Sequence, residues 1–168
     1  IYRFCRFTIK NFIFFCQYVT NNSKDLETVQ QVGHTLLTSI QRSVFRSVFI
    51  VKLKKPLVTE VHGVTFYSPL TFAAYEAHIP MLELFFQLGI GGGCIKTMMI
   101  QSREGNPRPR LQETLYDGHH GLLNALGLPG KGVDYMVEIV KKSRLLEFNR
   151  PIGFSIGGHS VSDYQATL

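Results

Sequence analysis

The sequence has few of the residues that hold metal ions or cross-link extracellular domains. Its 168 residues include three cysteines, Cys5, Cys16 and Cys94, and their separations match no metal-ligand motif. Three cysteines cannot all pair, so a reducing compartment is the simpler interpretation. His119 and His120 are interpreted as an exposed loop pair without a third metal ligand at a useful spacing, so we expect no zinc site.

No signal peptide is evident in the sequence, and its first apolar stretch is not expected to cross a membrane. The apolar residues at the start are interrupted by Arg3, Arg6 and Lys10, and no small-residue cleavage site follows them. A segment this short and this charged is not expected to span a bilayer. We therefore expect a cytoplasmic protein, either free or peripheral on the inner face of a membrane.

Two kinds of binding motif are missing as well. The run Gly91-Gly92-Gly93 lacks the spacing of a dinucleotide-binding fingerprint and is interpreted as a close approach of a helix to the next strand. The first 57 residues contain nine Lys or Arg and two acids, whereas residues 59–168 contain nine Lys or Arg and ten acids. Because the basic residues precede the fold and form no motif with aromatic residues, we expect no nucleic-acid partner.

Residues 1–56 are predicted to form a basic, amphipathic helical extension. Residues 1–19 place several phenylalanines and both nearby cysteines close to one helical face. The turn residues 21–23 are expected to supply an N-cap for a second helix that runs to about residue 46. Two interpretations of residues 1–46 stay open: they anchor the chain to a membrane surface, or they pack on a domain core or a partner.

The remaining chain alternates between strands and helices. A β-branched run at residues 48–53 predicts a linker or an edge strand, and residues 58–66 alternate and turn at Gly63 as a hairpin does. Strands are predicted at residues 70–74, 94–100 and 152–156, and helices at residues 79–88, 133–143 and 160–168. This order is typical of a parallel α/β domain. A complete (β/α)8 barrel needs roughly 250 residues, so residues 57–168 predict about its first three strands.

Residues 95–132 carry the most unusual chemistry. Lys96 interrupts a short apolar strand, where a lysine needs an anionic group to receive it. In the loop that follows, Pro107 and Pro109 restrict the backbone and aim the arginines around them. Arg103, Arg108 and Arg110 either form an anion site or, as we expect, hold the loop through Glu104, Glu113 and backbone carbonyls. Asn124 lies in a run without charge, so its amide needs a partner.

These motifs resemble a known family. Lys-Thr at 96–97, Arg-Glu-Gly-Asn-Pro-x-Pro-Arg at 103–110 and Asn-x-x-Gly-Leu-Pro at 124–129 are similar to the dihydroorotate dehydrogenases, the flavin enzymes of pyrimidine synthesis. The resemblance extends to Gly-Val-Asp-Tyr and Phe-Ser-Ile-Gly-Gly downstream. It implies FMN as the cofactor and dihydroorotate and orotate as substrate and product, with a proton leaving C5 and a hydride passing from C6 to the flavin.

The resemblance also implies the site residues. The lysine would lie near the flavin and stabilise its reduced form, and the asparagine amide would pair with the pyrimidine. The implied cofactor-binding residues are Ala73, Ala74, Lys96, Thr97 and Ser155. The implied substrate-binding residues are Lys96, Asn124, Leu126, Gly127 and Leu128. The general base of the family, a serine or cysteine, is expected beyond Leu168, so no catalytic base is predicted within this chain.

Some residues depart from the family pattern. Tyr75 stands where the family has a glycine that lets the flavin approach, and Ser155 stands where the membrane-bound class has an asparagine. The helical extension resembles the quinone-using class and the barrel motifs resemble the soluble class, so the acceptor, a quinone or another oxidant, stays open. Because the chain starts at Ile1 and ends within a predicted helix, we expect a fragment. The alternative is a truncated, non-catalytic barrel fragment that binds a membrane or partner through residues 1–46.

Overall fold

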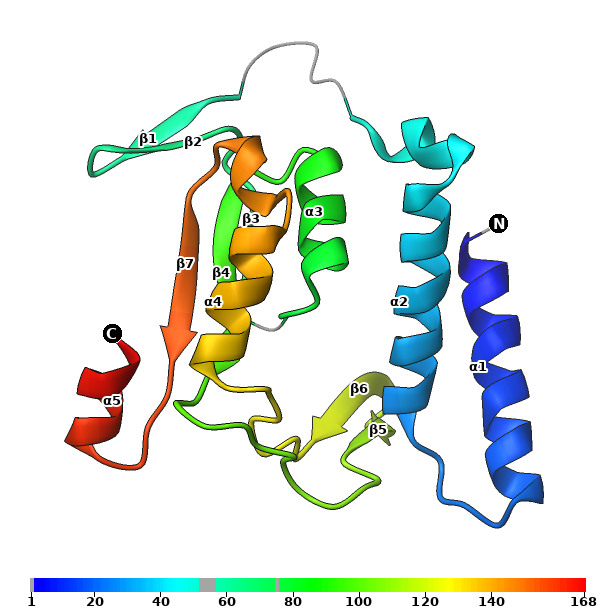
Figure 1. The fold of residues 1–168 in the computed structure, drawn as a ribbon. Coiled ribbons are helices and arrows are strands. Elements are labelled where there is room, and N and C mark those ends of the chain that lie inside the picture. The colour runs from blue at the N-terminus through cyan, green and yellow to red at the C-terminus, as the bar shows by residue number, and fades with distance from the viewer. Residues whose placement is uncertain (1, 52–56, 75) are drawn as a thin grey trace. The chain divides into compact units, whose positions relative to one another are not determined.

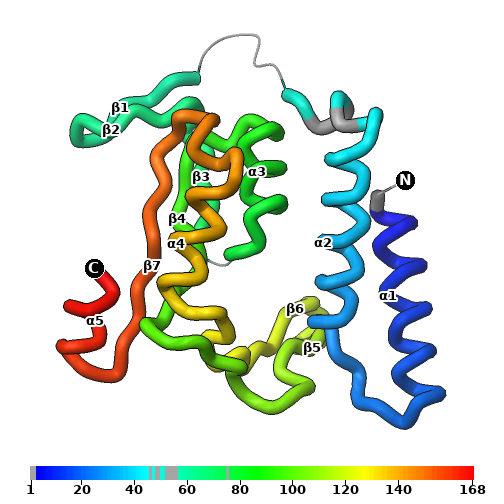
Figure 2. Tube along the Cα trace, viewed as in Figure 1, coloured from blue at the N-terminus to red at the C-terminus, as the bar shows by residue number. Residues whose placement is uncertain are grey.

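The computed structural model describes residues 2–51, 57–74 and 76–168, as the coloured trace in Figure 2 shows. The protein is a mixed α/β protein with helices and short strands (Figure 1). It divides into two compact units. The first comprises residues 1–37 and 104–129, and the second comprises residues 38–103 and 130–168.

Two long helices begin the chain. They are α1 (Tyr2–Val19) and α2 (Leu26–Arg42), which run in opposite directions (Figure 1). The N-cap predicted at residues 21–23 is wrong: the Asp25 carboxylate accepts a hydrogen bond of 2.9 Å from the backbone N–H of Glu27. Asp25 therefore satisfies one of the free N–H groups of the first turn and places its charge where the helix dipole favours it.

A two-stranded antiparallel hairpin completes the first unit. It consists of β5 (Leu111–Tyr116) and β6 (His119–Asn124). The connecting residues Asp117 and Gly118 have φ angles of 48° and 75°, as a two-residue hairpin turn requires. The predicted loop at His119 and His120 is therefore wrong, because these exposed residues begin β6. The same hairpin places Asn124 at the end of an antiparallel strand instead of a strand of the parallel sheet.

The second unit contains a three-stranded parallel sheet with the order β3-β4-β7. The strands are β3 (Thr71–Phe72), β4 (Gly92–Met98) and β7 (Ile152–Ile156), and the connecting helices are α3 (Ile79–Gln87) and α4 (Val133–Lys142). The predicted helices and the last strand are confirmed. The first strand is shorter than predicted, the second begins two residues earlier than predicted, and Tyr75 lies outside the described residues.

The core of this unit lies between the sheet and its helices. Phe72 and Ile95 from the sheet pack with Leu82 and Phe86 of α3 and with Val140 of α4. Leu82, Phe86 and Ile95 are fully buried, at 0% exposure. Burying one such side chain stabilises the fold by roughly 1.5–3 kcal/mol. The core therefore fixes β4, and with it the strand end that carries Lys96 and Thr97.

Shorter elements complete the second unit. The predicted hairpin is confirmed as β1 (Thr59–Val61) and β2 (Val64–Phe66). Residues 48 and 49 of the predicted linker or edge strand lie in the 3-10 helix η1 (Val44–Phe49), and its residues 52 and 53 lie outside the described part of the chain. A second 3-10 helix, η2 (Leu145–Phe148), follows α4, and α5 (Val161–Thr167) begins after Ser160. None of the described helices is long and apolar enough to cross a membrane.

Candidate functional site

The carboxyl ends of β4 and β7 bring two of the predicted flavin residues together. The hydroxyl oxygens of Thr97 and Ser155 are 2.8 Å apart. They meet because the strands are parallel and adjacent, so that their carboxyl ends lie at the same edge of the sheet. Lys96 precedes Thr97 and its side chain is half-buried. The edge therefore combines one cation with two hydroxyl groups.

The end of β3 is connected to the same edge by Glu76, which the sequence analysis missed. Its side chain is only 5% exposed. The Oε1 atom accepts hydrogen bonds of 2.8 Å from the backbone N–H groups of Ala77 and His78, and the backbone carbonyl accepts from the N–H of Lys96 at 2.9 Å. The predicted residues Ala73 and Ala74 follow β3 and are exposed. An acid directly after a predicted barrel strand was the signal that could have identified Glu76.

In the first unit, the predicted substrate residues lie at the end of β6 and directly after it. Asn124 is the last residue of this strand, and residues 126–128 come directly after it. The side-chain amide of Asn106 donates to the carbonyl of Ala125 at 2.8 Å, and its backbone N–H donates to the carbonyl of Leu126 at 3.0 Å. The loop at residues 104–110 thus holds the segment that contains the predicted pyrimidine contacts.

Two glycines permit this close approach. A Cβ atom on Gly105 would lie 2.2 Å from the carbonyl oxygen of Leu126, and one on Gly127 would lie 2.8 Å from the backbone nitrogen of Asn106. Both glycines have positive φ angles, of 83° and 72°, which other residues adopt only with strain. The Arg-Glu-Gly-Asn and Asn-x-x-Gly motifs therefore pack directly against each other.

Arg110 attaches this loop to α2 through hydrogen bonds. Its guanidinium group makes two hydrogen bonds of 2.8 Å to the carboxylate of Glu27 and also donates to the carbonyls of Glu104 and Asn106, at 2.6 and 2.9 Å. The hydrogen bond from Arg110 lowers the pKa of Glu27, and the positive charges of Arg110 and Arg108 lower it further. The same hydrogen bond raises the pKa of Arg110.

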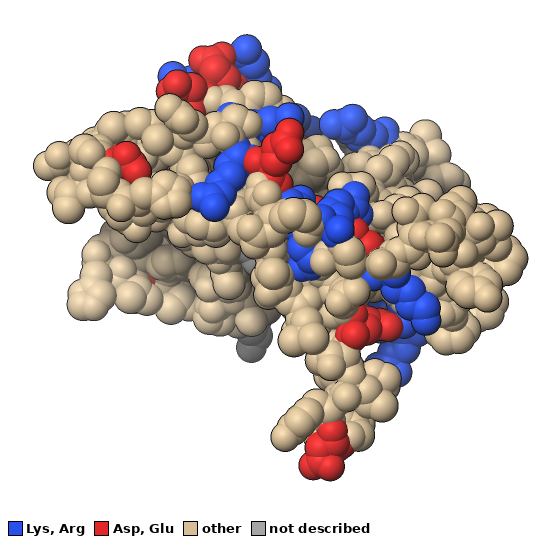
Figure 3. Space-filling view, turned by 90° about the horizontal axis from the view of Figure 1, so that it is seen from below, with Lys and Arg blue, Asp and Glu red and all other residues tan. Residues whose placement is uncertain are grey.

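A second arginine reinforces this attachment. Arg108 donates to the carboxylate of Asp25 and to the hydroxyl of Thr28, at 2.5 and 2.9 Å. The predicted structural role of Arg108 and Arg110 is confirmed, but their acidic partners lie at the start of α2, and Glu113 pairs with Lys10 instead, at 2.8 Å. On the face drawn in Figure 3, several basic side chains lie next to acidic ones.

Arg103 has a structural role in the second unit. Its backbone N–H and C=O exchange hydrogen bonds of 2.7 and 2.8 Å with Gly130, and its Nη1 atom lies 3.0 Å from Nε2 of His159. The backbone N–H of His159 donates to the Asp163 carboxylate, and this hydrogen bond is the main reason that the pKa of Asp163 is lowered. No cluster of three His, Cys, Asp or Glu side chains that could hold a metal ion occurs among the described residues.

The parallel β-α-β-α-β arrangement defines an α/β protein that gathers the polar side chains of Thr97 and Ser155 at one edge of its sheet. The sequence profile of the family described as dihydroorotate dehydrogenase matches residues 56–168. The chain therefore belongs to the dihydroorotate dehydrogenase family.

Individual relatives agree with this assignment. The chain is 32% identical over 117 residues to the catalytic subunit of dihydroorotate dehydrogenase B (NAD(+)) of Desulforudis audaxviator, covering 67% of this chain and 36% of that protein. It is 34% identical over 118 residues to the dihydroorotate dehydrogenase (quinone) of Glaesserella parasuis, covering 66% of this chain and 34% of that protein. The chain thus spans about a third of the length of these relatives.

A solved structure supports the fold. The ligand-free dihydroorotate dehydrogenase of Eimeria tenella superposes with a TM-score of 0.58 and 21% sequence identity, covering 82% of this chain and 40% of that one. At this identity the likeness establishes the fold alone. Relatives named for NAD(+) and for quinone match the sequence at nearly equal identity, so overall similarity does not select an electron acceptor.

Proposed function

We propose that this chain is the N-terminal part of a dihydroorotate dehydrogenase that oxidises dihydroorotate to orotate in pyrimidine biosynthesis. In this proposal residues 57–168 form the first part of a (β/α)8 barrel, and residues 1–56 form a basic, amphipathic extension. The observation that carries the proposal is the contact between the two family motifs, in which Asn106 bonds to Ala125 and Leu126 beside Asn124. This contact supports the proposal because it would hold the segment predicted to bind the substrate in one defined conformation.

The strand ends of the second unit have side chains suited to FMN. A half-buried lysine and two hydroxyls 2.8 Å apart match a ring that carries carbonyl and N–H groups and gains negative charge on reduction. FMN, when bound, would accept the hydride from C6 of dihydroorotate. Lys96 would stabilise the negative charge, and Thr97, Ser155 and the backbone of Ala73 and Ala74 would hold the ring.

The loop after β6 would bind the pyrimidine. The amide of Asn124 can donate to a pyrimidine carbonyl and accept from a ring N–H, which fixes the ring's orientation. The backbone of Leu126, Gly127 and Leu128 would line the same ring. Because Arg110 and Asn106 hold this segment, little ordering would be needed when the substrate binds.

The test is dihydroorotate-dependent reduction of a dye by a version of the protein that extends beyond Leu168 to include the expected general base, supplied with FMN. We expect turnover, and we expect the Lys96→Ala variant to lose it while its circular dichroism spectrum is unchanged. Lys141→Ala is the matched control, because Lys141 is exposed on α4 and is predicted to contact neither flavin nor substrate. Undiminished turnover in Lys96→Ala would remove this residue from the site. Replacing the dye by a short-chain quinone or by NAD+ then identifies the acceptor.

A second function is favoured by one face of α1. Phe4, Phe12 and Phe15 of the predicted apolar face are between 63% and 73% exposed, so that face lies at the surface of the described structure. Phe7 and Tyr18 of the same helix are also exposed, at 63% and 78%, and extend the aromatic face. We propose that this face binds an anionic membrane surface, because exposed aromatics and nearby basic residues are typical of interfacial helices. This binding would suit either a complete enzyme or a non-catalytic barrel fragment.

Vesicle sedimentation tests the membrane proposal. Phe7→Ser with Phe15→Ser should release the chain from vesicles that contain phosphatidylserine. Tyr116→Ser is the control, because Tyr116 is 82% exposed on β5 and lies outside the aromatic face of α1. Equal binding by the two variants would show that α1 is not the anchor.

A further inference from the structure

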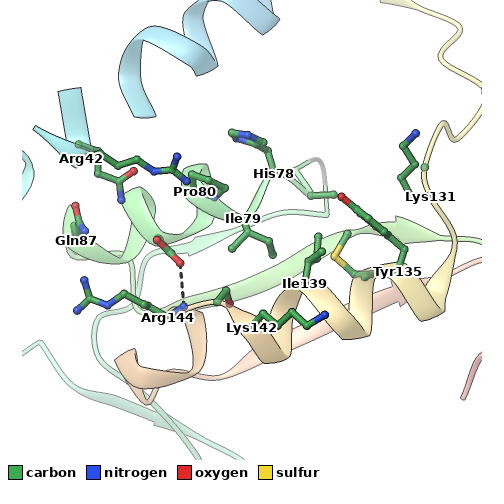
Figure 4. A pocket seen from close by; sticks show the side chains of 16 residues that line it. Arg42, His78, Ile79, Pro80, Gln87, Lys131, Tyr135, Ile139, Lys142 and Arg144 are labelled. Carbon is green, nitrogen blue, oxygen red and sulfur yellow. Dashed lines mark hydrogen bonds between the residues drawn. The ribbon is translucent and has the colours of Figure 1, made fainter. Parts of the chain in front are cut away.

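A cavity of about 820 Å3 lies within the second unit, between α3, α4 and the C-terminal end of α2 (Figure 4). This volume is in the range that holds small organic ligands. None of the residues predicted to bind flavin in this unit, namely Ala73, Ala74, Lys96, Thr97 and Ser155, lines it. The cavity is therefore separate from the strand-end site, and a ligand there would not depend on the proposed enzymatic function.

The charge around the cavity favours an anion. Arg42, Lys131, Lys142 and Arg144 line it, against one acidic residue, Glu83. Figure 4 shows Arg42 and Arg144 at one end and Lys131 at the other. Lys142 and Arg144 form ion pairs with Glu138 and Glu147, but their side chains remain 77% and 69% exposed. Such exposed pairs are weak, so an incoming anion can compete for these two cations.

Two buried amide oxygens at the cavity could each accept a hydrogen bond from a ligand. Gln41 is 7% exposed, and the Oε1 atoms of Gln41 and Gln87 are buried without a hydrogen-bond partner among the described residues. Both residues line the cavity. Because a buried amide oxygen without a donor is costly, an N–H or O–H group of a ligand would stabilise this end of the cavity.

The rest of the lining is apolar. Ile79 and Pro80 at the start of α3 line it together with Met136 and Ile139 of α4, and Ile79 and Met136 are buried. These side chains offer a surface to hydrocarbon but no specific polar contact. The lining as a whole thus combines an apolar floor, unpaired amide oxygens and a cationic rim.

We propose that this cavity binds a small organic acid that carries an apolar body and a hydrogen-bond donor. The carboxylate would lie near Lys142 and Arg144, the donor would reach Gln41 and Gln87, and the apolar body would cover the floor. N-octanoylglycine has all three features and is the probe of choice. Its uncharged amide, N-octanoylglycinamide, differs only at the carboxylate and serves as the ligand control.

The experiment is a titration of the whole chain, labelled at isoleucine methyl groups, followed by NMR. We expect the methyl signals of Ile79 and Ile139 to shift and saturate with N-octanoylglycine, whereas those of Ile9 and Ile13 on α1 do not shift. Lys142→Gln should weaken the affinity by about fivefold, the loss expected for one exposed charge pair. Lys141→Gln should change it by less than about twofold, because the side chain of Lys141 does not line the cavity.

Several outcomes would overturn the proposal. Shifts confined to Ile9 and Ile13 would place the probe on the aromatic face of α1. Equal affinities of the two lysine variants would show that Lys142 does not contact the ligand. Equally tight binding of N-octanoylglycinamide would exclude an anion site. Lys142→Gln is suited to this test because its only described ion pair is an exposed one with Glu138, so the fold should tolerate the change.

Discussion

Glu27 and Arg110 join the start of α2 to the loop before β5 through two hydrogen bonds of 2.8 Å. Their side chains are 14% and 11% exposed, so the pair is largely shielded from water. The same guanidinium group also donates to two backbone carbonyls of the loop. One side chain therefore determines both how the loop is shaped and how it is attached to the helix.

Replacing Arg110 by lysine should destabilise the protein although the charge is kept. A lysine cannot make the paired contact with Glu27 and reach both carbonyls at once. We expect a loss of about 2–3 kcal/mol in the free energy of unfolding, since buried groups lose their partners. Urea denaturation measures this loss. Arg144→Lys is the control, because its pair with Glu147 is exposed and should cost less than about 1 kcal/mol. Equal losses of unfolding free energy in the two variants would contradict the role of Arg110 in attaching the loop to α2.

The Glu27–Arg110 pair should also make stability depend on acid pH. The pKa of Glu27 in the folded protein is lowered, chiefly by the hydrogen bond from Arg110, from its ordinary value of 4.5. The unfolded chain therefore binds the proton more readily. The pair's contribution is fully present above pH 4.5 and is lost as the pH falls through the lower folded pKa.

Denaturation at pH values from 7 down to 3 checks this dependence. In the Glu27→Gln variant the free energy of unfolding should be lower at pH 7 and should fall less steeply below pH 4.5 than in the parent protein. Parallel pH profiles of the two proteins would show that another carboxyl group is responsible.

Replacing Gly105 by alanine should disrupt the loop at residues 104–110. The new Cβ would overlap the carbonyl oxygen of Leu126, at 2.2 Å, and the residue has a φ angle of 83°. We expect a cost of roughly 3 kcal/mol or more from the clash and the backbone strain together. Gly118→Ala is the matched control: its φ is 75°, but nothing lies within 4 Å of its Cβ position, so only about 1 kcal/mol is expected. Thermal unfolding distinguishes the two.

Arg150 tests how a half-buried cation is kept where no acidic partner is found for it among the described residues. Its guanidinium lies 4.2 Å from the ring centroid of Tyr67 and donates to the carbonyls of Phe86 and Ile90. Burial lowers its pKa. Arg150→Lys should cost about 2 kcal/mol, because a charge stays half-buried while the two carbonyls lose the planar donor.

Arg150→Met removes the charge but keeps much of the volume, and should therefore cost no more than Arg150→Lys. Denaturation curves of the two variants are the measurement. A much larger loss in the methionine variant would mean that the cation itself, through its contact with the aromatic rings, supplies most of the stability.

Local signals predicted much of the second unit. Pro80 and Gly89 mark the start and end of α3, and the hydroxyl of Ser160 accepts from the N–H of Asp163 as a cap of α5. The strand Ile152–Ile156 was predicted with its observed bounds. These features depend on neighbours within a few residues, which is why a single sequence reveals them.

The sequence predicted less of the structure of the first unit. Residues 111–124 show no clear alternation, so the β5–β6 hairpin was missed, although Asp117-Gly118 is a recognised hairpin signal. The partners of Arg108 and Arg110 were missed for a different reason. The paired side chains lie 83 positions apart in the sequence, and nothing in the composition of the loop indicates which distant carboxylate will receive each arginine.

The backbone pairing of Arg103 with Gly130 allows the segment between these two residues to vary in length and sequence. The two hydrogen bonds join the positions where residues 104–129 leave and re-enter the second unit. The intervening segment is therefore a closed module, whose ends are already fixed next to each other. Such a module can gain or lose residues at its tip, or be exchanged for that of a relative, at little entropic cost to the parallel sheet.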